Sequence, residues 1–272
     1  MELTKRDVGI LAALEKWGVM GLGQVDGLLF RTGLPEAERV RLFFNDLKRE
    51  DHWGGAYKRL RTLVNEGMVR TFRPTNYWQV YMLTGRGHEQ LRKHQQARFP
   101  HPIRGVGEAY LRHEITVCGV GLALTELLGL RVQTARQTFE ELRRRGLLRE
   151  GFSKLTLPDL LVSDAGGPRH AVEVELTAKS RQRYREMFRS RPRSTWGGMI
   201  LYLTGWPTGR EHIIHLAAKA QSSSIYAANL AVFGADPRRC EYLRRHSMGG
   251  IQKFLLPAVS TIQEPPRAEV AA

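Results

Sequence analysis

The sequence predicts an α/β protein of the α+β kind, with a largely helical N-terminal domain and a C-terminal domain on a central mixed sheet. Three observations predict this class. The chain has 272 residues, and at about 100–200 residues per domain this length favours two domains. Apolar residues first recur at helical spacing and then lead into a hairpin. After residue 108 the patterns run helix, strand, strand, strand, helix, strand, an αβββαβ order.

The composition is that of an ordinary globular protein, with 42% hydrophobic and 25% charged residues. No apolar run approaches the ~20 residues of a membrane span, and residues 1–7 lack the apolar stretch of a signal peptide. The two cysteines, Cys118 and Cys240, cannot build a disulfide framework or a cysteine-rich zinc site. We therefore expect a cytoplasmic protein that makes no membrane contact.

The charge is strongly positive, with 42 Lys and Arg against 27 Asp and Glu and a net charge of +15. Basic residues are spread over both predicted domains, so a single basic tail does not explain the excess. Such a balance favours a polyanionic partner. Nucleic acid is the first partner we expect, and an acidic protein surface is the second. A nucleic-acid partner implies a protein associated with the nucleoid.

The first helices are marked by a cap and by apolar spacing. Thr4 and Asp7 resemble a capping box that begins a helix, and Gly18 ends it. A short second helix is predicted around residues 25–29. Residues 31–53 look like an insertion that is partly helical.

A third helix and a hairpin complete the N-terminal domain, residues 1–98. Over 56–67 the apolar side chains share one face, which leaves the basic ones exposed, and strands over 69–73 and 78–83 follow. This order is typical of a winged helix-turn-helix, whose third helix enters the major groove of duplex DNA. A merely solvated helix face is the alternative, but the basic helix, basic hairpin and net charge agree on DNA. The predicted contacts are Lys58, Arg59, Arg61, Thr62, Arg70, Arg73 and Asn76.

Proline and glycine mark a predicted linker over 99–107, which separates this domain from a second one over 108–256. Residues 257–272 are predicted to be a flexible tail. The second domain is expected to contain a helix over 110–128, strands over 130–138, 157–162 and 170–176, a basic helix over 179–189 and a strand over 196–203.

Three acidic residues are expected to gather in the second domain. Glu173 and Glu175 lie on one face of a strand, and Asp159 lies at the end of its neighbour. Because close carboxylates repel, such a site usually holds a cation or a proton. Asp159 and Glu173 are suited to bind Mg²⁺, which would activate water against a phosphodiester. In the alternative, Glu173 and Glu175 are exposed and paired with nearby arginines.

The sequence Pro158-Asp159, followed by Glu173-Val174-Glu175 on this order of elements, resembles the PD-(D/E)XK nuclease superfamily. The resemblance implies that Asp159 and Glu173 bind the metal and that Glu114 completes the site. It also implies a catalytic Lys two positions after Glu173, where this chain has Glu175. Lys179 is the nearest substitute, and an active site would therefore comprise Glu114, Asp159, Glu173, Glu175 and Lys179.

The whole layout is similar to that of the replication-relaxation family, over about residues 4 to 205. His113-Glu114 and Tyr184 also fit that pattern. The resemblance implies a DNA-binding role in the replication or mobilisation of plasmids and integrative elements. It also implies that other replication or mobilisation proteins are partners.

A second basic strip is predicted beside the acidic residues. Arg181, Arg185 and Arg189 are spaced four apart and would line one helix face. Contacts of this kind to phosphates position the backbone of DNA without reading its sequence.

Three functions remain open at this point. The first is a duplex DNA-binding protein of a plasmid or mobile element with an inactive nuclease-like domain. The second is a Mg²⁺-dependent DNA endonuclease. The third is a winged-helix transcriptional regulator whose second domain mediates dimerisation or ligand sensing. Mg²⁺ would be the cofactor of the endonuclease, and the chain could assemble as a homodimer.

Overall fold

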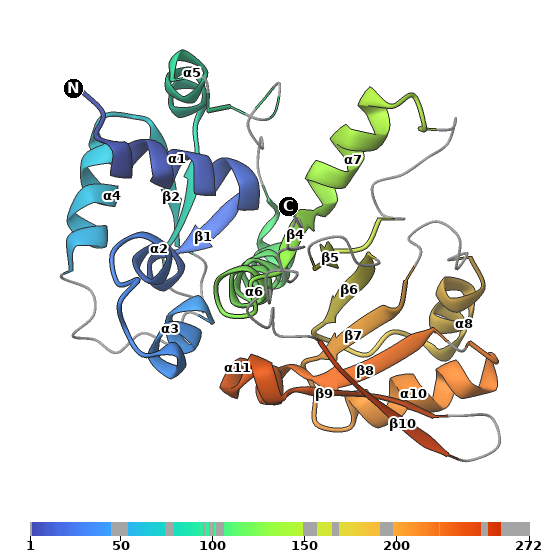
Figure 1. The fold of residues 1–272 in the computed structure, drawn as a ribbon. Helices are drawn as coiled ribbons and strands as arrows, with labels where there is room; N and C mark the ends of the chain where they lie inside the picture. The colour runs from blue at the N-terminus through green and yellow to red at the C-terminus, as the bar shows by residue number, and fades with distance from the viewer. Residues whose placement is uncertain are drawn as a thin grey trace, which may run out of the picture.

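A computed structural model of the chain describes residues 2–44, 54–73, 79–94, 96–97, 99, 101, 106–148, 157–164, 169–190, 198–222, 224–245 and 250–256. These residues form a small antiparallel sheet and a seven-stranded mixed sheet, surrounded by helices (Figure 1). The α/β class and the mixed sheet expected from the sequence are confirmed. Within this part of the chain, no helix has the length and apolar character needed to cross a bilayer.

The N-terminal part consists of α1 (Lys5–Trp17), β1 (Val19–Gly21), α2 (Leu22–Leu29), α3 (Glu36–Phe43), α4 (Gly55–Asn65), β2 (Val69–Phe72), β3 (Val80–Leu83) and α5 (Gly85–Lys93). The capping box at Thr4 and Asp7 is present at the start of α1. The three strands are antiparallel in the order β1-β3-β2. β1 was not predicted, because three residues are too few to show a period and its pairing with β3 is long-range.

The described part of the predicted insertion, residues 31–44, contributes α3 to the core. Val40, Leu42 and Phe43 of α3 are buried, and α3 packs against α2, α6 and α11. Residues 45–53 lie outside the described residues. The prediction of partial helix is therefore confirmed for Glu36–Phe43.

The C-terminal part consists of α6 (Glu108–Glu126), β4 (Arg131–Thr134), α7 (Ala135–Arg144), β5 (Leu160–Ser163), β6 (His170–Glu175), α8 (Arg181–Ser190), β7 (Ile200–Thr204), α10 (Gly209–Lys219), β8 (Ile225–Asn229), α11 (Leu230–Ala235), the 3₁₀ turn η3 (Pro237–Arg239), β9 (Glu241–Arg245) and β10 (Ile251–Leu255). The sheet order is β10-β9-β8-β7-β6-β5-β4. β6, β7 and β8 are parallel, and the other neighbours are antiparallel. The expected order helix, three strands, helix, strand is therefore present, with α7 added inside it.

One sequence expectation for this part was wrong, and three strands of the sheet were not predicted. The strand predicted over 130–138 ends at Thr134, because the Thr134 side chain accepts from the backbone N–H of Gln137 and begins α7. The sheet also continues beyond the predicted four strands, through β8, β9 and β10. Only the pairing of these later segments with β7 and with one another reveals them as one sheet.

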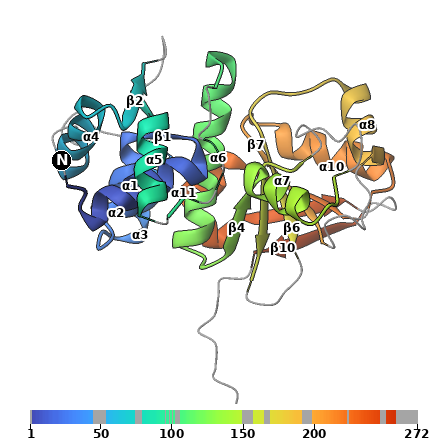
Figure 2. The same ribbon diagram turned by 90° about the horizontal axis from the view of Figure 1, so that it is seen from above.

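The sheet separates two layers of helices (Figures 1 and 2). On β6, Val172 and Val174 join the apolar cluster that includes α6, while Ala171 joins the cluster formed by α8 and α10. This alternation is the period of two expected for a strand that is buried on both faces. The first of these clusters continues from the sheet through α6 into α1, α2 and α3. The two predicted domains therefore share one core.

One residue of the predicted linker, Phe99, connects α1 and α7. The Phe99 side chain is buried, its backbone N–H donates to Glu15 of α1 at 3.2 Å, and its ring lies 3.9 Å from the Arg136 guanidinium of α7. The predicted tail over 257–272 lies outside the described residues.

Glycines on α6 allow the close approach of the N-terminal part. A Cβ at Gly121 would overlap the rigid ring of Trp17, whereas a Cβ at Gly85, the first residue of α5, would meet nothing within 4 Å. We expect Gly121→Ala to lower the free energy of unfolding by about 1–3 kcal/mol through overpacking. Gly85→Ala should be neutral or stabilising by up to about 1 kcal/mol. Urea denaturation measures both, and equal effects of the two substitutions would contradict the packing described.

Candidate functional site

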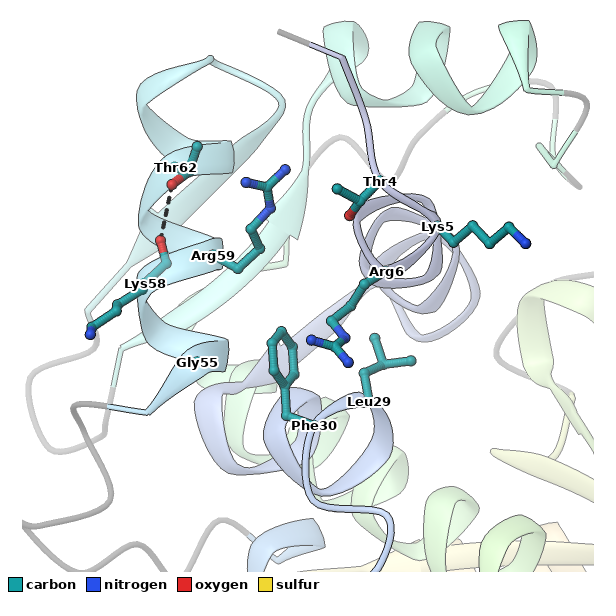
Figure 3. A pocket seen from close by; sticks show the side chains of 9 residues that line it. All are labelled: Thr4, Lys5, Arg6, Leu29, Phe30, Gly55, Lys58, Arg59 and Thr62. Atoms are coloured by element: carbon teal, nitrogen blue, oxygen red, sulfur yellow. Dashed lines mark hydrogen bonds between the residues drawn. The ribbon is translucent and has the colours of Figure 1, made fainter.

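A basic pocket of about 830 Å³ opens on the N-terminal part, between the start of α1, the end of α2 and α4 (Figure 3). Its lining combines basic side chains with the apolar side chains of Leu29 and Phe30. The lining residues are Thr4, Lys5, Arg6, Leu29, Phe30, Gly55, Lys58, Arg59 and Thr62. Lys58, Arg59 and Thr62 were predicted from the sequence to contact DNA.

Arg59 has a structural partner in this pocket. Its guanidinium makes hydrogen bonds to both carboxylate oxygens of Asp7, and Asp7 is fully buried. The Thr4 hydroxyl also donates to Asp7, at 2.7 Å. Burial alone would raise the pKa of Asp7, but the hydrogen bonds and charge of Arg59, with those of Thr4, outweigh burial and lower it. Arg59 therefore holds α4 against α1.

Lys58 and Arg61 present their charge to solvent instead. Both side chains are exposed on α4, and neither makes an ion pair with any carboxylate in the described part of the chain. In Figure 3 the Lys58 side chain points away from the helix bundle, and the Thr62 hydroxyl donates to the Lys58 carbonyl at 3.1 Å. Of the predicted DNA contacts, Lys58 and Arg61 are therefore the best placed to meet a polyanion.

The start of α1 adds two basic residues that sequence reasoning missed. Lys5 and Arg6 are exposed, and the Arg6 guanidinium lies 4.8 Å from the centroid of the Phe30 ring. Basic residues in a first helical turn oppose the helix dipole. The sequence thus contained one signal of an anion site here, namely two basic residues where the helix dipole disfavours them. A bound anion would offset this unfavourable interaction.

The start of α4 also faces the pocket through Gly55. Gly54 at its N-cap has no side chain to accept from the first-turn N–H groups, and no side-chain cap is formed. A helix start of this kind attracts anions through its N–H groups and dipole. The positive dipole end thus adds to the charge of Lys58.

The predicted hairpin contacts lie beside α4. β2 packs against α4 at the edge of the small sheet, and Arg70, Phe72 and Arg73 are exposed on this strand and just after it. Asn76 lies outside the described residues. Exposed basic residues are therefore present both on α4 and on the strand that packs against it.

The predicted acidic site lies on the C-terminal part, where α6 meets the ends of β5 and β6. The backbone N–H of Val174 donates to Asp159 Oδ2 at 2.8 Å. His113 Nε2 from α6 lies 3.0 Å from the Val174 carbonyl and 3.3 Å from Asp159 Oδ2. Asp159 is thus held by one backbone group and one imidazole.

His113 was not among the predicted site residues, although it precedes Glu114. Burial would lower the pKa of His113, but hydrogen bonds and attraction from Asp159 and Glu114 outweigh burial and raise it to about 10. The imidazole is therefore cationic at neutral pH. Its position on α6 beside Asp159 is a tertiary contact that spacing in the sequence does not reveal.

Lys179 reaches back to the end of β6. Its ammonium group contacts Glu175 Oε1. Burial raises the pKa of Glu175, the contact with Lys179 opposes this rise, and the charge of Asp159 adds to it. The structure therefore brings Lys179 to the carboxylate cluster, where it neutralises Glu175.

The other two predicted acids lie on different elements. Glu173 is buried and lies opposite Tyr202 of β7 in the sheet register, on the face of β6 that is covered by α8 and α10 and that it shares with Glu175. Glu114 lies on α6, over the other face, with its carboxylate 3.9 Å from His113 Nδ1. Glu173 and Glu175 are buried, so the alternative of two exposed glutamates is wrong.

The cluster does not fit Mg²⁺ in this arrangement. Within the described ranges, no group of three or more His, Cys, Asp or Glu side chains is placed to hold a metal ion. Asp159 and Glu175, two of the predicted acids, already face cationic side chains, His113 and Lys179. A divalent cation at the same carboxylates would have to overcome repulsion from both.

The predicted basic strip is on α8. Arg181 and Arg185 are exposed one turn apart, whereas the side chain of Arg189 is outside the described residues.

Comparisons with protein-family models, curated proteins and solved structures find no significant match to this chain. The function is therefore inferred from the chain's own geometry and from the resemblance carried by its motifs.

Asp7 makes the stability of the N-terminal part depend on pH. Because its pKa is lower in the folded chain than its ordinary value of 3.8, ionised Asp7 favours folding. This stabilisation is complete above that ordinary value and is lost as the pH falls through the folded-state pKa. At neutral pH we expect Asp7→Asn to lower the free energy of unfolding by about 1–3 kcal/mol, with a difference that shrinks below about pH 4.

Urea denaturation from about pH 7 to about pH 3 tests this expectation. Glu89→Gln is the control, because Glu89 is exposed and pairs with Lys93 on the surface of α5; its effect should stay within about 0.5 kcal/mol. A difference between wild type and Asp7→Asn that stays constant over the whole pH range would count against the Asp7–Arg59 pair.

Proposed function

We propose that this chain is a duplex DNA-binding protein whose helix α4 enters the major groove. The observation that carries the proposal is the exposed pair Lys58 and Arg61 on α4, beside a pocket where the starts of α1 and α4 meet. Each of these features favours the phosphate backbone of a nucleic acid. Lys5 and Arg6 add phosphate contacts at the rim.

The order of elements supports a winged helix-turn-helix mode of binding. Helices α1, α2 and α4, with the β2–β3 hairpin after α4 and β1 at the far edge of the small sheet, follow the layout of such domains. In this mode the hairpin contacts the DNA backbone or minor groove. Arg70 and Arg73 are the described hairpin residues that would make those contacts.

In this proposal the C-terminal part resembles a PD-(D/E)XK nuclease but does not cut DNA. Glu175 stands where the resemblance implies a lysine, and His113 and Lys179 supply positive charge to Asp159 and Glu175. The part serves as a scaffold that carries further basic surface. The endonuclease alternative retains one supporting observation, the contact of Lys179 with the carboxylate cluster.

The resemblance to the replication-relaxation family extends the proposal to the replication or mobilisation of a plasmid or other mobile element. Footprinting on DNA from the native element separates this role from that of a transcriptional regulator. Protection of an origin or transfer region supports the proposal, whereas protection of a palindrome at a promoter supports a regulator.

Removal of the two exposed charges on α4 tests the proposed interface. In Lys58→Ala/Arg61→Ala we expect weaker duplex binding and a slope of log K against log salt that is smaller by about 2, since each phosphate contact contributes about 0.9. Fluorescence anisotropy of a labelled duplex over a salt series measures both quantities. The matched control is Lys93→Ala/Arg143→Ala, which removes the same charge from residues paired with Glu89 and Glu140.

The control should leave affinity and slope close to those of wild type. An unchanged slope in folded Lys58→Ala/Arg61→Ala would exclude α4 from the interface.

A cleavage assay tests the proposed lack of catalysis. We expect supercoiled plasmid to stay intact with the protein and Mg²⁺ or Mn²⁺, because positive charge already neutralises the carboxylates. Nicking or linearisation, measured on agarose gels, would count for the endonuclease only if Asp159→Ala abolished it. Metal-dependent cleavage that Asp159→Ala abolishes would overturn the proposed lack of catalysis.

A further inference from the structure

A second basic surface lies on the C-terminal part, over α8, α10 and the end of β9. We define it by five exposed residues, and it extends the predicted strip on α8 onto two further elements. The five residues are Arg181, Arg185, His215, Lys219 and Arg245.

Packing of the three elements brings these residues together. α10 contacts both α8 and β9, and the ring of His212 on α10 lies 5.8 Å from that of Tyr184 on α8. The charges of Lys219, Arg245 and Arg181 lower the pKa of His215, as expected if these three cations surround it. Sequence positions far apart therefore form one surface.

Acidic groups do little to neutralise this surface. On α8, Glu186 interacts with Gln182 and lies 3.8 Å from Arg183, and on α10 Glu211 pairs with Arg210. On β9, Glu241 pairs with Lys253 of β10. None of the five surface residues has an ion-pair partner within the described ranges.

The two basic surfaces lie at opposite ends of the molecule. In both ribbon views α4 is at one end, whereas α8 and α10 are at the other, with α6 and the sheet between them (Figures 1 and 2). Because the two parts share one core through α6, this separation is built into the fold.

We propose that the second basic surface binds the phosphate backbone of another DNA segment, so that one chain bridges two duplexes. This proposal rests on the proposed function, which supplies the first duplex at α4. We expect the second contact to be independent of sequence, because its exposed Arg and Lys side chains would contact phosphates, which carry no sequence information. Bridging would bring two sites of a DNA molecule together.

A capture assay tests bridging with the full chain. A biotinylated duplex on beads is mixed with protein and a second, fluorescent duplex, and the captured fluorescence is measured. Wild type should capture the second duplex, and Arg181→Ala/Lys219→Ala/Arg245→Ala should capture at least about tenfold less. Anisotropy with a single duplex should change less than about threefold in this variant, because the α4 surface is intact.

The control is Lys93→Ala/Arg143→Ala/Arg145→Ala, which removes the same charge from residues paired with neighbouring glutamates and should capture like wild type. Capture should also fall in Lys58→Ala/Arg61→Ala, since bridging needs both ends. Undiminished capture by the triple variant of the second surface would overturn the proposal, because two copies joined to each other would then do the bridging. If the wild-type protein binds one duplex but captures no second duplex, the bridging proposal is overturned and the proposed function stands. If the wild-type protein binds no duplex at all, the proposed function itself is overturned.

Discussion

The buried side chain of Gln24 joins the two halves of this protein. It has no exposed surface, its carbonyl oxygen accepts from the backbone N–H of Gly21 at 2.9 Å, and its amide donates to the carbonyls of Phe43 and Ile115 at 2.9 and 2.7 Å. One side chain thus satisfies three backbone groups, at the start of α2, at the end of α3 and on α6. Its loss would remove a hydrogen-bond partner from buried backbone groups on three elements, and a buried group left without any partner costs about 1–3 kcal/mol.

The surfaces argued to be functional depend on this junction. Gly119 and Gly121 of α6 leave room for Phe43 and Trp17, so α6 serves both as a wall for the N-terminal helices and as a cover for the sheet. The Phe99 junction with Glu15 and Arg136 adds a second attachment. Because packed side chains connect the N-terminal helices to the sheet, the fold itself sets the orientation of α4 relative to α10.

Charge is divided between the interior and the surface in a consistent way. The pairs Asp7–Arg59, Asp159–His113 and Glu175–Lys179 are buried or half-buried, and each combines one carboxylate with one cation. Such pairs contribute almost nothing to the net charge, whereas Lys58, Arg61 and Lys219 are exposed and add to the excess of +15. The same division turns an acidic cluster that resembles a metal site into a set of internal ion pairs.

The sequence by itself determined the local elements, which are the capping box at Thr4, the alternation along β6 and the basic faces of α4 and α8. Each of these depends on residues only a few positions apart in the chain. Only the tertiary structure decided where Arg59 points, which histidine meets Asp159, and that β8, β9 and β10 extend the sheet. The physical reason is separation along the chain. Arg59 and Asp7 are 52 residues apart, and Gln24 and Ile115 are 91 apart, so no period or spacing marks these contacts before the core brings them together.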